Sequence, residues 1–394
     1  MRAGAMHGYW WLMASLLFGF PSQAAVVKVT AEYKPAVYES DNGTFVSTTT
    51  CVKTSDGMWL SSCSGGVMSL DSLLFSLKTK VKRNVKKNIS NTKDSFVSLG
   101  SLGNKTMIIT SDKGKQFSVL FKPDKLGVHF DAVVNQDDGW KIYHTSFTNP
   151  KGGCQYLDRT VAGNVNLTAW IVLWGGVGGK SCYTELSVDV VSEIKAMFFG
   201  FKIKPPSPLE MPNGNYTGSI NLSVGPNKDI DLGNGEYEDN QLTIELTLKV
   251  QHQIKMEFPP GSDKVVLQPP GGWHDWIYRS KTYQPPYLIA ELPYRLWGSG
   301  GFSVWLNCQY SDGEYCMLNN TRSGHKARFD VIYQNGEREE FVLKAKTKKA
   351  FGGLSKNAAR TLIFKVDKPA LAEMMKSPGS TYQGNVTIIY DSAI

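Results

Sequence analysis

The stretch QLTIELTLKV, residues Gln241 to Val250, constrains the fold more than any other feature of the sequence. Its apolar residues, from Leu242 to Val250, stand at every second position and alternate with polar ones. A period of two places the two kinds of residue on opposite faces of a β-strand, whereas a helix has a period of 3.6. We therefore predict a long strand with one face in a hydrophobic core and one in water, as in a sandwich of antiparallel sheets.

Strand patterns of this kind recur along most of the chain. Runs rich in β-branched and aromatic residues are separated by turn residues, and the chain holds 38 Gly and 18 Pro. Helical periodicity is confined to two short segments, Ser69–Lys78 and Lys368–Lys376. The sequence therefore predicts an all-β fold built of immunoglobulin-like sandwiches, with two short helices.

A break in this pattern divides the chain into two parts. The long alternating segment ends near residue 250, and residues 259–286 are rich in Pro and Gly before strand patterns resume. We predict two tandem β-sandwich domains, at residues 25–252 and 253–394. The second is of the size expected for an immunoglobulin-like sandwich.

The N-terminus indicates export. Arg2 precedes an apolar run from Tyr9 to Phe20, and small residues around Ala24 are suited to cleavage. The run is too short to span a membrane, so residues 1–24 are interpreted as a secretory signal peptide. The alternative is an N-terminal anchor.

The cysteines fit an oxidising compartment. Six of them fall into three local pairs, and nearest-neighbour disulfides are favoured among the fifteen possible pairings. No C-x-x-C motif is present and the histidines are scattered, so we expect no metal site. The expected pairs are Cys51 with Cys63, Cys154 with Cys182, and Cys308 with Cys316.

Two groups of residues are candidates for receptor contact. The formal net charge is +8, which favours acidic partners such as sialylated glycans. Lys78, Lys80 and Lys82 would share one face of an extended segment and present a basic stripe. The favoured alternative is a solvated edge strand, because lysines protect sheet edges from aggregation.

The second group combines aromatic rings with carboxylates, as sugar-binding sites do. It comprises Asp137, Asp138, Trp140 and Tyr143, and the segment Gly271–Tyr278 has a similar character. The alternative for any single residue is a turn with one aromatic ring packed inward, and this is favoured.

Catalytic motifs are missing from the sequence. It holds no G-x-S-x-G and no H-E-x-x-H, and WGGVGGKS (Trp174–Ser181) lacks the glycine spacing of a phosphate-binding loop. Asp137 and Asp138 are adjacent, so in a strand they would face opposite sides and would not act as an acid/base pair. We therefore expect no enzymatic reaction, no cofactor and no nucleic-acid partner.

The chain ends on a further alternating segment, YQGNVTIIYDSAI. Val386, Ile388 and Tyr390 share one face, and Thr387 and Ile389 share the other. Terminal residues usually fray unless they are held by other parts of the structure. A half-buried strand in this position therefore raises the question of which segment pairs with it.

Three motifs resemble the chaperone–usher fimbrial tip adhesins, most closely the colonization-factor (class 5) and cable-pilus family. CVKTSDGMWLSSC is similar to an early short disulfide loop of that family. MPNGNYTGSINLSV, followed by GEYEDNQLTIELTLKVQHQIKMEFP, resembles the strands that lead from its adhesin domain into its pilin domain. GSTYQGNVTIIYDSAI resembles its closing strand.

The resemblance implies a pilin-type domain that lacks one strand and so carries an apolar groove. Val386, Ile388 and Tyr390 would line it beside a strand lent first by a periplasmic fimbrial chaperone and, at the outer-membrane usher, by the major pilin subunit. The implied location is the fimbrium tip at the bacterial surface, where the first domain binds a host glycan or surface protein. The alternative for the last strand is an ordinary closing strand of a complete sandwich.

The chain differs from the family at the receptor site. Val46 and the segment GPNK, ending at Lys228, stand where sialic-acid-binding members have arginines, so that pocket is not carried over. A donor peptide is also missing before the first strand, which indicates a tip subunit. The alternatives are a minor structural pilus subunit without a receptor, a secreted carbohydrate-active β-sandwich enzyme, and a eukaryotic adhesion ectodomain.

Overall fold

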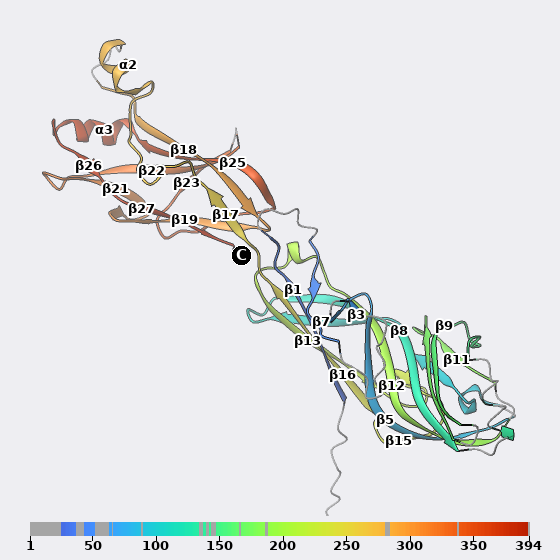
Figure 1. Ribbon diagram of the computed structural model, residues 1–394. Helices are drawn as coiled ribbons and strands as arrows, with labels where there is room; N and C mark the ends of the chain where they lie inside the picture. The colour runs from blue at the N-terminus through green and yellow to red at the C-terminus, as the bar shows by residue number, and fades with distance from the viewer. Residues whose placement is uncertain are drawn as a thin grey trace, which may run out of the picture.

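The computed structural model describes residues 25–36, 43–51, 63–64, 66–87, 90–133, 137–138, 142, 147–164, 167–185, 188–279, 284–336 and 339–392. The predicted signal peptide, residues 1–24, lies outside the described residues. The fold is all-β, with two β-sandwich domains arranged end to end (Figure 1). No helix in the described part of the chain is both long and apolar enough to cross a membrane.

The first domain is dominated by one strongly curled sheet (Figure 1). Its main path runs in the order β15-β5-β12-β8-β7-β13-β16-β1-β2, and β10 and β9 branch from β8. A smaller sheet, β11-β6-β14, and the hairpin β3-β4 complete the domain. The strands are β1 (Ala25–Tyr33), β2 (Val46–Ser47), β3 (Cys63–Ser64), β4 (Val67–Met68), β5 (Leu73–Val85), β6 (Ser98–Ser101), β7 (Lys105–Ser111), β8 (Gln116–Val133), β9 (Gln155–Asn164), β10 (Leu167–Gly175), β11 (Ser181–Tyr183), β12 (Val190–Lys204), β13 (Gly214–Ser223), β14 (Ile230–Asp231), β15 (Glu236–Tyr237) and β16 (Gln241–Val250), with short 3₁₀ turns at Thr92–Asp94 and Pro208–Glu210.

β16 has the burial that its sequence predicts. Its apolar residues, from Leu242 to Val250, are all at most 1% exposed. It pairs in parallel with β1 and antiparallel with β13, so both of its edges are used. Its polar residues lie on the outer face, and its apolar face lies in the large core of the first domain.

The helix predicted for Ser69–Lys78 is wrong, because this part of the chain leads into the long strand β5. β5 pairs with β12 along its length and with β15 at Val81 and Lys82. Leu73 and Phe75 lie on the core side of this strand. Pairing with distant segments therefore outweighed a weak local helical preference.

The second domain consists of two facing sheets. The larger has the order β17-β18-β25-β22-β21-β20, with β23 beside β22 and β26 beside β21, and the smaller has the order β24-β19-β27. Its elements are β17 (Ile254–Glu257), α2 (Gly272–Arg279), β18 (Leu288–Gly298), β19 (Phe302–Cys308), β20 (Ser311–Asp312), β21 (Tyr315–Asn320), β22 (Lys326–Asn335), β23 (Glu339–Leu343), β24 (Lys349–Phe351), β25 (Ser355–Val366), α3 (Lys368–Met375), β26 (Tyr382–Gln383) and β27 (Val386–Asp391).

α3 confirms the second predicted helix. The side chain of Asp367 accepts a hydrogen bond from the backbone N–H of Ala370 and caps the N-terminus. Pro369 stands in the first turn, where its missing N–H has no cost. Leu371 is buried in the core of the second domain and attaches the helix to the sheets.

The two domains meet at a short connection. β16 ends at Val250 and β17 begins at Ile254, so three residues link the two main sheets. The buried His252 donates from Nε2 to the carbonyl of Met211 at 2.9 Å, and its backbone N–H donates to Asn213 Oδ1 at 2.6 Å. The chain passes from the main sheet of the first domain to that of the second within this connection. The domain boundary at 252/253 stays a prediction.

Two of the expected cysteine pairs are disulfide-bonded. Cys154–Cys182 ties the start of the β9 region to β11, and Cys308–Cys316 joins the end of β19 to β21. The third expected pair, Cys51 with Cys63, involves a side chain outside the described part of the structure. Both described disulfides lie between strands that are close in sequence, as nearest-neighbour pairing requires.

A candidate peptide-binding groove beside the last strand

The last strand, β27, is paired on one edge in the described structure. It runs antiparallel to β19, with Val386 opposite Cys308 and Tyr390 opposite Val304. The other edge carries backbone N–H and C=O groups for which no strand partner is described. An edge of this kind is a template for a further strand.

The inward face of β27 is only partly covered. Val386, Ile388 and Tyr390 pack against the core of the second domain, but all three remain of intermediate exposure. The corresponding residues of β16 in the first domain are at most 1% exposed. Both strands have apolar residues at every second position on the inward face, and only β16 has this face fully buried.

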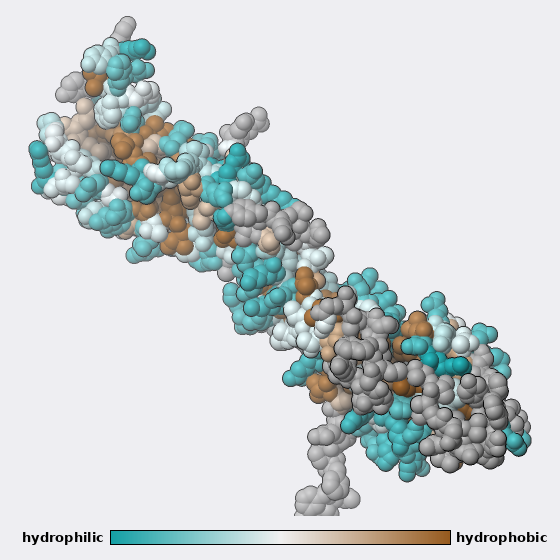
Figure 2. Space-filling model, in the orientation of Figure 1, coloured by the Kyte–Doolittle hydropathy of each residue, from teal (hydrophilic) through white to brown (hydrophobic). Residues whose placement is uncertain are grey.

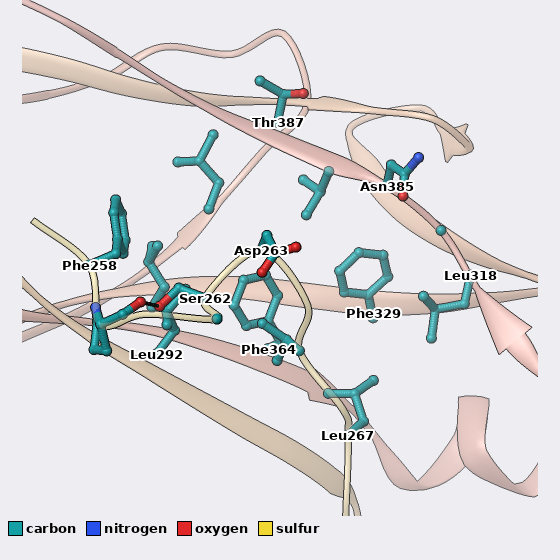
Figure 3. A pocket seen from close by; sticks show the side chains of 17 residues that line it. Phe258, Ser262, Asp263, Leu267, Leu292, Leu318, Phe329, Phe364, Asn385 and Thr387 are labelled. Carbon is teal, nitrogen blue, oxygen red and sulfur yellow. Dashed lines mark hydrogen bonds between the residues drawn. The ribbon is translucent and has the colours of Figure 1, made fainter. Parts of the chain in front are cut away.

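Beside β27 lies an apolar groove with a volume of about 810 Å³. Val386 and Ile388 line it from β27, whereas the side chain of Thr387 points away from the floor (Figure 3). In the space-filling view, hydrophobic residues gather over this part of the second domain (Figure 2). The other apolar residues that line the groove are Phe258, Val265, Leu267, Leu292, Leu318, Phe329, Leu362 and Phe364.

The floor of the groove is the inner face of the larger sheet. Leu292 comes from β18, Leu362 and Phe364 come from β25, and Phe329 and Leu318 come from β22 and β21. These strands are neighbours in the sheet order, so their inward residues form one continuous surface. The smaller sheet ends at β27 and leaves this strip without a covering strand.

The second wall is the segment that follows β17. Its backbone is paired with β18 at Glu257 and again at Gln268, but no pairing is described for residues 258–267. Prolines at 259 and 260 lack the N–H groups that a strand ladder needs, so the chain leaves the sheet edge there. Val265 and Leu267, near the end of this loop, pack against the core.

Tyr390 contributes in a different way from the two aliphatic residues of β27. Its hydroxyl is hydrogen-bonded to that of Tyr294, and its ring lies 6.1 Å from that of Phe302. Burial raises the pKa of Tyr390 and of Tyr294 well above the usual value. Tyr390 thus fixes the end of β27 nearest the first domain, while Val386 and Ile388 face the groove.

This geometry suits an extended peptide. A strand laid along the free edge of β27 would place alternate side chains over the floor and form backbone hydrogen bonds on one side. β27 is six residues long, which corresponds to about 20 Å of extended chain. The apolar lining selects aliphatic or aromatic side chains, and Asp263 and Asn385 add polar groups to it (Figure 3).

The predicted basic stripe lies on the outer face of β5, with Lys78 and Lys82 exposed. Lys80 forms an ion pair of 2.6 Å with Glu238, and this hydrogen bond raises the pKa of Lys80. On the neighbouring β12, Glu193 stands opposite Lys82. Acidic side chains thus accompany the lysines along this face. A role in receptor contact stays a prediction.

The second predicted group is only partly described. Asp137 and Asp138 occupy a helical turn after β8, with Asp137 exposed. Trp140 and Tyr143 lie outside the described residues. The strand register places Lys82, Glu193 and Asp131 in one row across β5, β12 and β8, and Asp137 follows six residues after Asp131. The strand order thus places the lysine stripe and Asp131, which precedes the second group in sequence, on neighbouring strands of the first domain.

Arg83 was not singled out from the sequence, although it stands directly after the lysine stripe. It points inward, is 3% exposed and donates hydrogen bonds to the carbonyls of four residues. Desolvation lowers its pKa to about 10. Arg83 therefore stabilises the fold and is not part of a binding surface. Because successive side chains of a strand point to opposite faces, its position directly after Lys82 was the signal that it points inward. The acceptors are the carbonyl oxygens of Lys93, Ser95, Phe96 and Asn234.

The groove floor was also not identified from the sequence. The strands that hold Phe329, Leu362 and Phe364 were expected, but their alternation is the same as that of a sealed core. Residues 259–286 were interpreted only as a Pro- and Gly-rich segment near the start of the predicted second domain. The signal for a wall was the run Val265–Leu267, three apolar residues within that segment, of which Val265 and Leu267 line the groove.

No sequence model of a protein family matches the chain, and neither does any curated protein sequence. Solved structures do match. A chain from a chaperone–tip adhesin complex of CFA/I fimbriae is 9% identical, with 94% of this chain and 97% of that chain covered and a TM-score of 0.25. The adhesive subunit of the CFA/I fimbria of enterotoxigenic Escherichia coli is 10% identical, with 93% and 92% covered and a TM-score of 0.26.

A third similar structure is a chaperone–tip adhesion subunit pre-assembly complex from the archaic chaperone–usher Csu pili of Acinetobacter baumannii. A chain of this complex is 10% identical, with 93% of this chain and 98% of that chain covered and a TM-score of 0.22. All three structures contain adhesive subunits of fimbriae or pili, the class of protein that the sequence motifs resemble. Because the TM-scores are below 0.5, the fold and the groove rest on the residues of this chain alone.

Proposed function

We propose that this protein is the tip adhesin of a chaperone–usher fimbria. In this proposal the second domain accepts a strand from another subunit, and the first domain binds a receptor on a host surface. The observation that carries the proposal is the apolar groove beside β27, whose inward residues Val386 and Ile388 remain partly exposed. A complete sandwich would have a strand in this position.

The physical argument is that the groove favours binding of a strand. Each aliphatic side chain that becomes fully buried contributes roughly 1.5–3 kcal/mol. The free edge of β27 adds backbone hydrogen bonds and fixes the register. The same edge would promote aggregation if it stayed open, which is a reason for a chaperone to cover it before assembly.

The proposed order of partners is the one that the family resemblance implies. A periplasmic fimbrial chaperone lends an edge strand to the groove during export. At the outer-membrane usher, the N-terminal extension of the major pilin subunit replaces it. The protein is then located at the fimbrium tip on the bacterial surface. No enzymatic reaction is part of this function.

Receptor binding is assigned to the first domain, residues 25–252. This domain has a hydrophobic core of its own and lies at the opposite end of the molecule from α2 and α3 (Figure 1). Glycan arrays and host-cell binding with this domain alone test the assignment. Binding to a defined glycan or surface protein supports it. Absence of binding under all conditions favours a minor structural pilus subunit.

The groove is tested by dependence on a chaperone. We expect the mature chain, residues 25–394, to accumulate as a soluble periplasmic monomer only when a cognate fimbrial chaperone or a donor peptide is supplied. Size-exclusion chromatography and protease resistance provide the measurements. A stable, monomeric and protease-resistant protein without either ligand would contradict the proposal.

A further inference from the structure

The helix α2 (Gly272–Arg279) is largely exposed. None of its residues is buried, and Trp273, Ile277 and Tyr278 are 44%, 66% and 76% exposed. It stands beyond the sheets at the tip of the second domain (Figure 1) and protrudes from the surface (Figure 2). Large apolar side chains are thus presented on an element that covers no core.

Local interactions give this helix little stability. Asp275 and Arg279 form an ion pair one turn apart at 3.8 Å, and the rings of His274 and Tyr278 lie 4.9 Å apart. Such pairs contribute roughly 0.2–0.5 kcal/mol each. Isolated helices shorter than about 12 residues are marginal in water, and most helices are stabilised by packing of an apolar face. α2 therefore has the properties of an element that packs against a partner.

The base of the α2 segment is part of the groove. Leu267 lines the groove, and Gln268 next to it pairs with Ile289 of β18 through two backbone hydrogen bonds of 2.8 and 3.0 Å. α2 begins four residues later, at Gly272. Gln284, after the helix, donates to the carbonyl of Lys368 at the start of α3. The helix is thus anchored on both sides at one end of the groove.

The position of the first domain restricts where a partner can lie. Phe258 and Leu292 line one end of the groove, and Leu267 and Leu318 line the other (Figure 3). The first end follows directly after the domain connection. There Asn213 of the first domain donates to the carbonyl of Ser392, just after β27. The end of the second domain that carries α2 and α3, which we call the free pole, lies on the opposite side (Figure 1).

We infer that α2 is a docking element for the folded body of the subunit whose strand occupies the groove. This inference rests on the proposed function. A subunit that inserts its N-terminal strand must place its own folded domain outside the groove. Because the first domain occupies one end of the groove, the folded domain of that subunit lies at the free pole. Trp273, Ile277 and Tyr278 then become buried between the two subunits. The partner is a protein with an apolar surface patch next to its donor strand.

Site-specific photo-crosslinking in assembled fimbriae tests this. A photoreactive phenylalanine analogue is placed at Asp263 in the lining of the groove, at Tyr278 on α2, or at Val342 on β23, a control that is 48% exposed. Cross-linked peptides are identified by mass spectrometry. We expect the first probe to label the N-terminal strand of a subunit and the second to label the folded domain of the same subunit. The control should give at least tenfold less product.

The outcomes separate the two proposals. If Asp263 labels a donor strand while Tyr278 labels a chaperone, the usher, lipid or no partner, the docking inference is wrong and the proposed function stands. If Asp263 labels no subunit strand, the proposed function is wrong, and the docking inference is wrong with it.

A binding measurement gives the magnitude. Ile277→Asp/Tyr278→Asp is compared with Val342→Asp in the mature chain. With the folded subunit identified by crosslinking, we expect the double variant to bind about tenfold or more weakly, because apolar anchors dominate interface energies. With the isolated N-terminal peptide of that subunit, affinity should be unchanged, which also shows that the variant is folded. Equal affinity of both variants for the folded subunit overturns the inference.

Discussion

Single residues decide how the two faces of β5 differ. Lys78, Lys80 and Lys82 lie on the face that contacts water, and Arg83 lies on the other. Its guanidinium is held by backbone carbonyls in place of a carboxylate partner, and Gly233 approaches so closely that an added Cβ would lie 2.3 Å from Nη2. A buried charge in such a position depends on every one of its hydrogen bonds.

We predict that Arg83→Leu destabilises the first domain by at least about 3 kcal/mol, since each buried carbonyl left unpaired costs about 1–3 kcal/mol. Urea unfolding, followed by the fluorescence of the buried Trp170 and Trp174, provides the measurement. The neighbouring Lys82→Leu is the control and should stay within about 0.5 kcal/mol of the wild type. An Arg83→Leu effect as small as that of the control would show that the carbonyls find other partners.

The tyrosine pair at the end of β27 makes the second domain sensitive to alkali. Burial raises the pKa values of Tyr294 and Tyr390 above those in the unfolded chain, which are about 10. The folded state therefore holds more protons above pH 10. The stabilisation from this difference is complete below pH 10 and is lost as the pH rises.

We expect the free energy of unfolding of the second domain to fall between pH 10 and pH 12. In the double variant Tyr294→Phe/Tyr390→Phe, the free energy of unfolding should fall clearly less steeply with pH. Burial also raises the pKa of Tyr333, and this tyrosine accounts for part of the pH dependence that remains. Denaturant unfolding at several pH values measures the slope. Tyr278→Phe, on the exposed helix α2, is the control and should follow the wild type. Identical slopes in all three proteins would contradict the assignment.

At the scale of elements, β16 and β27 show that one pattern leads to two outcomes. Both have apolar residues at every second position on the face toward a core, although β27 also has Ile389 on its outer face. β16 lies between β1 and β13 and is sealed, whereas β27 has β19 on one side and the groove on the other. The difference lies in the neighbouring strands and not in the strand itself.

We predict that Ile388→Asp abolishes capture by the chaperone and insertion of a donor strand, because a carboxylate would then have to be buried among apolar side chains. The matched control is Thr387→Asp, one residue away on the opposite face, which should retain at least half of wild-type complex formation. Co-purification with the chaperone and counts of assembled fimbriae provide the measurements. Normal fimbriae in the Ile388→Asp strain would refute the role of this face.

The whole molecule is built around two separate hydrophobic cores. One includes residues from Val27 to Val250, and the other includes residues from Leu288 to Leu371. Residues 251–253 connect the main sheets, and the described contacts at the junction include hydrogen bonds around His252 and Asn213 and a ring contact of 5.4 Å between Tyr33 and His252. The two cores are therefore expected to unfold largely independently.

We predict two transitions in differential scanning calorimetry of the mature chain in complex with a donor peptide. Each tenfold rise in the concentration of free peptide should stabilise only the second domain, by about 1.4 kcal/mol. The transition of the first domain serves as the internal control and should not move. A single transition, or a shift of both by the peptide, would show that the domains are coupled through the junction.

Much of the fold could be predicted from local sequence patterns. The alternation in β16 and β27, the helix α3 and the two described disulfides all depend on residues close together in the chain. The helix α2 was not predicted, and the first half of the strand β5 was predicted to be helical. In β5, pairing with β12 outweighed a local preference for helix. The helix α2 starts at two glycines with positive φ angles, Gly271 and Gly272, and it has no apolar face packed on a core, so the usual helical pattern is missing.

The sequence by itself determined which face of each strand is apolar, because that depends only on the order of neighbouring residues. Only the tertiary structure decided that Val386 and Ile388 border a groove. Whether an apolar face is covered depends on how many strands pack against it, and these strands come from distant parts of the chain. Here the smaller sheet ends at β27, whereas the floor of the groove extends across β18, β25, β22 and β21. The tertiary structure likewise placed α2 at the free pole, because its position depends on where β18 and the first domain lie.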